Sequence, residues 1–250
     1  PHEYFPFSDF LIRKIMKLVD GYIVQSSIVE DELKSYVNNP VYLKKFHPIY
    51  DNYTDKIDRD KARKKIKISY PHVILFFGLI RAYKGLDVLL KSIKNIFLEN
   101  KNIMLLIVGE CYENKKKYKK LIMETGFQNR IIWIDKFVTD DDVSIYFSAS
   151  DVVVLPYKNA SQSGVVPLAY HYEKPVICSD IKSLSEVIVN GETGYTFKTQ
   201  PELEKLLINF FENFKDKFFV QKIKKYKTLL SWESFSNGIL DLYKSLNEKR

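Results

Sequence analysis

The chain has 250 residues, a formal net charge of +8, a mean hydropathy of −0.22 and 46% hydrophobic residues. This composition is typical of a globular protein with a core, and no apolar run approaches the roughly 20 residues of a membrane span. The two cysteines, Cys111 and Cys178, cannot form a disulfide framework, so we expect free thiols in a reducing, cytoplasmic compartment. The chain lacks an initiating Met, so we expect it to begin partway through a longer protein.

The basic residues occur in three runs, at 59–67, 115–120 and 222–227, each on an expected surface helix. A solvated face is favoured over a binding patch for these runs. We do not expect nucleic acid as a partner, because the sequence has no aromatic-interleaved RNA motif and no zinc-ligand spacing. An anionic membrane face stays open as a partner.

The first fifty residues alternate between helix and strand. Spacing of apolar residues predicts a helix at 8–19 and strands at 20–26 and 41–46. Ser27 to Glu30 has the pattern of a capping box, which predicts a helix from there to about residue 37. These elements are too few for a domain and are interpreted as the end of a preceding α/β domain, in residues 1–50. The polar stretch 51–58 is a plausible interdomain linker.

From residue 59 the alternation is regular and continues to residue 246. Apolar strands are predicted at 72–77, 103–108, 130–134, 151–155, 175–178 and 194–197. Helices are predicted at 59–66, 84–97, 113–125, 140–148, 165–172, 183–189, 201–214, 218–229 and 232–246. Continuous apolar strands that alternate with helices indicate an α/β fold, a doubly wound parallel sheet with helices on both faces.

A strand, a polar loop and a helix follow one another between residues 151 and 172. The loop contains Ser161, Gln162, Ser163 and Gly164, and the predicted helix begins at Val165. Loops of this kind offer unpaired backbone N–H groups, and the helix dipole adds positive potential at the same point. The sequence therefore predicts an anion site at the carboxyl ends of the strands.

A second loop with suitable chemistry follows the strand at 72–77. Gly78 permits a sharp turn, and Arg81 and Lys84 supply a guanidinium fork and a point charge, which suit a pyrophosphate. As surface charges these two residues would be unremarkable, but beside the 161–164 loop we favour phosphate binding. Ser163 has no evident base and acid partner, which argues against a nucleophilic hydrolase. No Gly-x-Gly-x-x-Gly turn follows a strand, which argues against a dehydrogenase.

Five segments, in a consistent order, carry a resemblance to a known family. They read FFGLIRAYKGLDVLL, NIMLLIVGE, SASDVVVLPY, SQSGVVPLAYHYEKPVICSD and SEVIVNGETGYTF. Together they resemble the carboxyl-terminal, nucleotide-sugar-binding domain of GT-B glycosyltransferases of family 4 (group 1). The resemblance implies a donor-binding domain at 51–230, an interdomain crossing at 47–50, and a terminal helix at 231–250 that returns to the first domain.

The resemblance implies a retaining glycosyltransferase of polysaccharide biosynthesis that needs no metal or other cofactor. Arg81 and Lys84 would hold the donor diphosphate and act in catalysis by stabilising its charge. Backbone N–H groups of Ser163, Gly164 and Val165 would bind the same phosphates.

The remaining donor contacts are also implied by the resemblance. The segment 135–138, with Lys136, Phe137 and Val138, would contact the base, and Glu186 would contact the ribose or the sugar. The acceptor would be a glycan or a lipid-linked saccharide, at the cytoplasmic face of a membrane in the second case.

The sequence departs from the family at two positions. Most members carry glutamates eight residues apart where this chain has Ala160 and Leu168. A non-catalytic nucleotide- or partner-binding relative is therefore the alternative function. The chain also lacks the first half of the N-terminal domain, so we expect it to bind nucleotide while turning over little or no sugar.

Overall fold

The computed structural model describes residues 8–248, which form two compact units. One unit runs from Ile49 to Leu229, and the other combines the described residues up to Pro48 with those from Leu230 onward. Within 8–248 no helix has both the length and the apolar character of a membrane span. The domain boundaries at 50/51 and 230/231 stay predictions, because compactness alone does not establish an independent domain. Residues 1–7 of the first predicted domain lie outside the described part.

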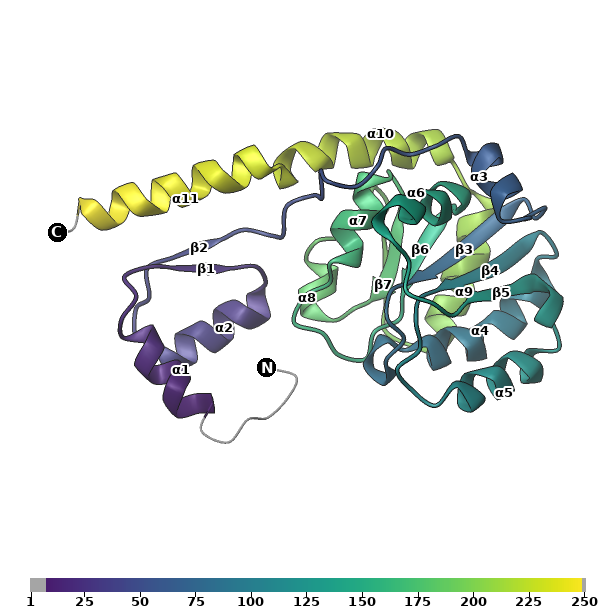
Figure 1. Cartoon of the computed structure of the whole chain (residues 1–250), viewed down its shortest axis with the longest axis horizontal. Coiled ribbons are helices and arrows are strands. Elements are labelled where there is room, and N and C mark those ends of the chain that lie inside the picture. The colour runs from purple at the N-terminus through teal and green to yellow at the C-terminus, as the bar shows by residue number, and fades with distance from the viewer. Residues whose placement is uncertain (1–7, 249–250) are drawn as a thin grey trace. The chain divides into compact units, whose positions relative to one another are not determined.

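A six-stranded parallel sheet forms the centre of the Ile49–Leu229 unit (Figure 1). In spatial order its strands are β5 (Ile131–Ile134), β4 (Ile103–Val108), β3 (His72–Phe77), β6 (Val152–Leu155), β7 (Val176–Ser179) and β8 (Gly194–Phe197). All five neighbouring pairs are parallel. The first strand of the unit thus lies inside the sheet, which is the doubly wound order. The predicted α/β fold is confirmed.

Helices cover both faces of this sheet, which explains the continuous apolar strands. All six residues of β4 are buried, as are all four of β6. The helix α4 packs between α5 and α9 on one face, and α3 packs on α6 at the other (Figure 1). The helices are α3 (Arg59–Lys65), α4 (Leu86–Glu99), α5 (Lys115–Thr125), α6 (Asp140–Ala149), α7 (Val165–His171), α8 (Lys182–Ser185), α9 (Gln200–Glu212) and α10 (Asp216–Lys227).

One residue of the first basic run is a core residue and not a surface charge as expected. Arg63 is 7% exposed, and its Nη2 lies 2.8 Å from Oδ2 of the buried Asp151. Arg63 also donates to the Ala149 carbonyl at 2.9 Å, while Asp151 accepts the Val73 N–H at 2.7 Å. A buried charge is tolerated only when it is paired and hydrogen-bonded, and this network meets that condition.

The smaller unit contains α1 (Ser8–Met16), β1 (Tyr22–Val24), α2 (Ser27–Tyr36), β2 (Tyr42–Lys44) and α11 (Trp232–Asn247). β1 and β2 pair in parallel, and Lys45 donates to Ser234 of α11 at 2.8 Å. The predicted capping box at Ser27 is wrong by one position. Ser26 caps α2 by accepting the Val29 N–H, while Glu30 instead forms ion pairs with Lys34 and Lys44.

The stretch 51–58 is packed against the α/β unit and is not a free linker. The Thr54 carbonyl accepts the Tyr172 hydroxyl at 3.0 Å, and the Ile57 N–H donates to Ser148 Oγ at 3.1 Å. Lys56 forms an ion pair with Glu173. The main chain of Thr54 and Ile57 and the side chain of Lys56 therefore attach this stretch to the unit.

Candidate functional site

The two loops predicted to bind an anion leave adjacent strands. The loop 78–85 follows β3, and the loop 156–164 follows β6, which pairs with β3 in parallel. β3 and β6 are the strands at which the order of the sheet reverses. Loops diverge at such a switch point and leave a crevice at the carboxyl edge, where doubly wound proteins bind ligands.

Direct contacts hold these two loops together. The Lys158 N–H donates to the Tyr83 carbonyl at 2.7 Å, and Lys158 Nζ lies 2.8 Å from Asp87 Oδ2. Gly85 has a φ of +69°, and a Cβ at this position would lie 1.8 Å from the Pro156 carbonyl oxygen. Glycine is therefore required there, both by its backbone conformation and by the close approach of the β6 loop.

Lys84 is the more buried of the two predicted cations. It lies in the 3₁₀ turn Ala82–Lys84 and not in α4, where the sequence placed it. Its Nζ lies 5.7 Å from the centre of the Tyr157 ring and passes close to Gly78, where an added Cβ would be 2.8 Å away. Burial, and then the charge of Arg81, lowers the pKa of Lys84 to about 8. An anion bound beside this ammonium would favour its charged form.

Arg81 is exposed, and its position is fixed by the loop that follows β4. Its guanidinium carbon lies 5.2 Å from the centre of the Tyr112 ring, a cation–π contact. The Ile80 N–H donates to the Glu110 carbonyl, and the Ala82 N–H donates to Glu113 Oε1, both at 2.9 Å. The two main-chain bonds hold the backbone on either side of Arg81, and the contact with Tyr112 is the one that involves its guanidinium.

The loop 156–164 contains backbone donors that the fold does not use. Among the described residues, the N–H groups of Ser163 and Gly164 have no hydrogen-bond partner. The Val165 N–H differs from the expectation, because it donates to Ser163 Oγ at 3.2 Å. Ser161 is half-buried and Gln162 is exposed in this loop. Two of the three expected backbone donors are thus available to an anion.

Three side chains that the sequence analysis did not identify contact this loop. The buried Tyr157 hydroxyl lies 3.5 Å from Ser163 Oγ, and Ser183 Oγ donates to the Ala160 carbonyl at 2.5 Å. Tyr50 packs on Gly164, where an added Cβ would be 2.7 Å from its hydroxyl. Only the proline before Tyr157 gave a local signal, because the partners of Tyr50 and Ser183 are far away along the chain.

The positions at which the resemblance implies glutamates are both apolar and buried. Ala160 is 3% exposed and Leu168 is 4% exposed. No carboxylate is present at either place, and Leu168 packs into the core face of α7. Neither position can therefore supply the carboxylate that the resemblance implies.

The expected base segment lies on the β5 side of the crevice. Asp135 accepts the Cys111 N–H at 3.0 Å and pairs with Lys115 at 2.9 Å, which joins the segment to the loop after β4. Lys136 is exposed, Phe137 is 69% exposed, and Val138 is buried.

Glu186 lies on the opposite side, directly after α8, and is half-buried. The strands that precede the base segment and Glu186, β5 and β7, are four strand spacings apart, or about 19 Å. Residues 8–248 contain no group of three or more His, Cys, Asp or Glu side chains arranged to hold a metal ion.

Comparison with solved structures finds the same fold in two other proteins. Sucrose-phosphate synthase from Thermosynechococcus elongatus superposes with a TM-score of 0.78 at 18% identity, over 97% of this chain and 62% of that chain. Anabaena HepE, in complex with UDP and glucose, superposes with a TM-score of 0.76 at 17% identity, over 96% of this chain and 68% of that chain. At these identities the likeness establishes the fold.

Curated relatives share more sequence over shorter stretches. Spore coat protein SA of Bacillus subtilis is 28% identical over 169 residues, which are 64% of this chain and 43% of that protein. The GDP-mannose:glycolipid 4-beta-D-mannosyltransferase of Xanthomonas campestris is 29% identical over 56% of this chain and 39% of its own length. The lipopolysaccharide 1,2-N-acetylglucosaminetransferase of Salmonella typhimurium is 24% identical over 76% and 53%, so the chain spans about half the length of such relatives.

The family model of the glycosyl transferases group 1 matches residues 58–227, which is more than half of the chain and contains both loops of the crevice. The resemblance inferred from the five sequence segments is thereby confirmed. This chain belongs to the glycosyl transferases group 1.

Proposed function

We propose that the α/β unit binds the diphosphate of a nucleotide sugar between the loops 78–85 and 156–164, and presents the sugar for transfer to a glycan or lipid-linked acceptor. The observation that carries this proposal is that Arg81 and Lys84 lie on the loop after β3, and the unpaired N–H groups of Ser163 and Gly164 on the loop after the adjacent β6, with Lys84 and Ser163 both beside Tyr157. Two relatives support it, since one is named for GDP-mannose and HepE was solved with UDP and glucose.

The chemistry of the site would be electrostatic. When the bond between the sugar and the diphosphate breaks, negative charge grows on the leaving diphosphate. We infer that the guanidinium of Arg81, the ammonium of Lys84 and the two backbone donors stabilise that charge. Losing one donor of this kind costs about 10²–10³ in kcat. We infer that these cations replace a metal ion and that transfer proceeds with retention, as the family resemblance implies.

We infer that the two outer segments contact different parts of the donor, because they follow strands on opposite sides of the β3–β6 junction. We infer that Lys136, Phe137 and Val138 contact the base, because the exposed Phe137 ring offers a stacking surface beside the diphosphate crevice. Glu186 lies on the other side of the β3–β6 junction, so we assign it to the sugar end. Each assignment predicts which part of the donor a substitution affects.

Calorimetric titration with UDP, GDP and ADP tests the diphosphate site. The variant Arg81→Ala/Lys84→Ala removes two charge-assisted contacts and should bind at least about a hundredfold more weakly. The matched control Lys91→Ala/Lys94→Ala removes two exposed lysines from α4 and should bind like the unchanged chain. Equal affinity in both double variants would refute the assignment of the crevice.

A non-catalytic relative is the second candidate function, favoured by the burial of Ala160 and Leu168. Such a protein would bind the nucleotide without transferring the sugar. The test is a transfer assay on this chain joined to a complete N-terminal domain. Nucleotide binding without any product would favour the second candidate, and product formation would exclude it.

A further inference from the structure

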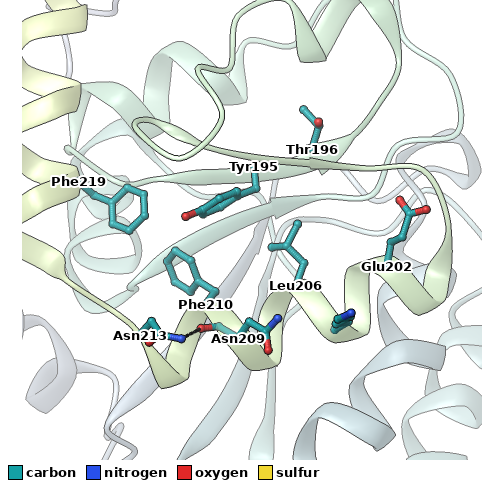
Figure 2. A pocket seen from close by; sticks show the side chains of 9 residues that line it. Tyr195, Thr196, Glu202, Leu206, Asn209, Phe210, Asn213 and Phe219 are labelled. Carbon is teal, nitrogen blue, oxygen red and sulfur yellow. Dashed lines mark hydrogen bonds between the residues drawn. The ribbon is translucent and has the colours of Figure 1, made fainter.

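A pocket of about 440 Å³ lies at the β8 edge of the sheet, away from the crevice (Figure 2). We call it the edge pocket. It is lined by Tyr195, Thr196, Glu202, Lys205, Leu206, Asn209, Phe210, Asn213 and Phe219, from β8, α9, the residue after α9, and α10. β8 is three strand spacings from β3, or about 14 Å. The volume of the edge pocket is within the range of small-molecule sites, roughly 300–1,000 Å³.

Three aromatic rings form one end of the edge pocket (Figure 2). Phe210 and Phe219 are 6% and 5% exposed, with ring centres 5.4 Å apart. The half-buried Tyr195 ring lies 6.4 Å from Phe210 and 6.3 Å from Phe219, edge-on to both. The two phenylalanines are held by the core, so this apolar end is rigid and exists before any ligand arrives.

Polar groups surround the aromatic end. Across the described residues, the Tyr195 hydroxyl, the Lys205 ammonium and the Asn209 side-chain amide make no hydrogen bond or ion pair with the protein. Asn213 donates to the Asn209 backbone carbonyl at 3.1 Å, which leaves its own amide oxygen toward solvent. The edge pocket therefore combines apolar rings with two amides, a phenol hydroxyl and an ammonium whose hydrogen-bonding groups are not all used by the fold.

An added peptide strand does not fit this edge. The outward Thr196 N–H donates to Asn190 Oδ1 at 2.9 Å, and the Lys198 N–H donates to Glu202 Oε2 at 2.7 Å. The Gly194 carbonyl accepts the Gly191 N–H at 2.9 Å. With these main-chain groups occupied, β8 has no open row of donors and acceptors for strand addition.

Phosphate-bearing and purely alkyl ligands also fit poorly. The one cation in the lining, Lys205, lies one turn from the carboxylate of Glu202, so the pocket has no net positive charge for a phosphate. An alkyl chain would cover the Tyr195 hydroxyl and the Asn209 amide without replacing their bonds to water, and each such loss is unfavourable.

We propose that the edge pocket is an accessory carbohydrate site, which binds one or two sugar rings of a neutral glycan. A pyranose has a face of C–H groups, which packs on aromatic rings, and a rim of hydroxyl groups, which hydrogen-bond to amide and phenol side chains. The half-buried Tyr195 ring, packed on the buried Phe210 and Phe219, would contact the C–H face, and Asn209, Asn213 and Lys205 would bind the hydroxyl groups. The site does not depend on nucleotide binding in the crevice.

The test is a titration of the ¹⁵N-labelled full chain with glucose, mannose and N-acetylglucosamine, with and without saturating UDP. We expect chemical-shift changes at the amides of Tyr195, Thr196 and Asn209, unchanged by UDP. Tyr195→Phe keeps the ring and Asn209→Ala removes an exposed amide, and each should weaken binding about three- to tenfold. Glu212→Ala, an exposed position of α9 outside the lining, should have no effect.

Several results would overturn the proposal. One is that none of the three sugars changes the chemical shifts of the edge-pocket amides, or that the changes are confined to the loops 78–85 and 156–164. Another is that Asn209→Ala and Glu212→Ala bind the sugars with equal affinity. If octanol or inorganic phosphate causes larger chemical-shift changes at the edge pocket than the sugars do, the pocket binds that class of ligand and the carbohydrate proposal is wrong. Failure of UDP to bind would leave the sugar result interpretable, because the two sites are read from separate amides.

Discussion

Replacing Gly85 by alanine tests whether the close contact between the two loops shapes the donor crevice. Gly85 has left-handed backbone angles, with φ +69° and ψ 25°, and adjoins the Pro156 carbonyl. An added Cβ would lie 1.8 Å from that oxygen, whereas contacts under 3.0 Å are essentially never seen. The two loops must therefore separate by on the order of 1 Å, because a close-packed interior leaves no other room.

The expected cost has two parts. A non-glycine residue in the left-handed region costs about 1–2 kcal/mol. Forcing extra volume between two packed segments adds about 1–3 kcal/mol. We therefore expect Gly85→Ala to lower the free energy of unfolding by about 2–5 kcal/mol and to weaken UDP binding, since Arg81 and Lys84 move away from Ser163 and Gly164.

The control is Gly126→Ala, measured by urea unfolding and by UDP titration alongside Gly85→Ala. Gly126 has a similar φ of +75°, but an added Cβ there would meet nothing within 4 Å. It should lose only the conformational part of the stability and keep its UDP affinity. If the two variants lose equal stability and bind UDP equally well, the contact between Gly85 and Pro156 does not determine the crevice.

Three further outcomes follow from buried ionisable groups. Because the pKa of Lys84 is lowered to about 8, UDP affinity should fall as the pH rises through that value, and Lys84→Arg should remove this dependence in calorimetric titrations. Asp151→Ala should destabilise the fold by about 3–5 kcal/mol in urea, since it leaves the buried Arg63 unpaired. Burial raises the pKa of the Cys178 thiol to about 12, so brief treatment with iodoacetamide at neutral pH should leave it unmodified in the native chain and modify it in urea. Mass spectrometry reads the result, and modification of Cys178 in the native chain would contradict its burial.

The sequence alone predicted the boundaries of those elements that depend on local chemistry. The strands His72–Phe77, Ile103–Val108 and Gly194–Phe197 begin and end at the residues predicted. The first two are apolar runs that end at a glycine, so burial on both faces and the following turn are both visible locally. The parallel order of the sheet followed from the alternation of such strands with helices.

Other features depend on residues that are far apart in the chain. Arg63 was expected on a surface helix because its neighbours are lysines, and only the pairing with Asp151 explains its burial. The spacing of the apolar residues after Lys84 predicted a helix that begins at Lys84. The left-handed Gly85 instead separates Lys84 from α4. The packing of Tyr50 on Gly164 likewise has no local signal. Periodicity reports which face of an element is buried, and it carries no information on the partner.

The pairing of β3 with β6 explains why the crevice depends on so few contacts. These strands pair only at Ile74–Val152 and Leu75–Val153, whereas β3 and β4 pair over six positions. The β3–β6 ladder therefore ends before the two loops begin, and the main-chain bond that the sheet gives to the first loop comes from β4, whose Val108 carbonyl accepts the Gly78 N–H at 2.9 Å. The relative position of the two loops must then come from the loops themselves, through Lys158 and the Gly85–Pro156 approach. Substitutions that touch no ligand, such as Asp87→Ala, should therefore weaken nucleotide binding by releasing the side chain of Lys158.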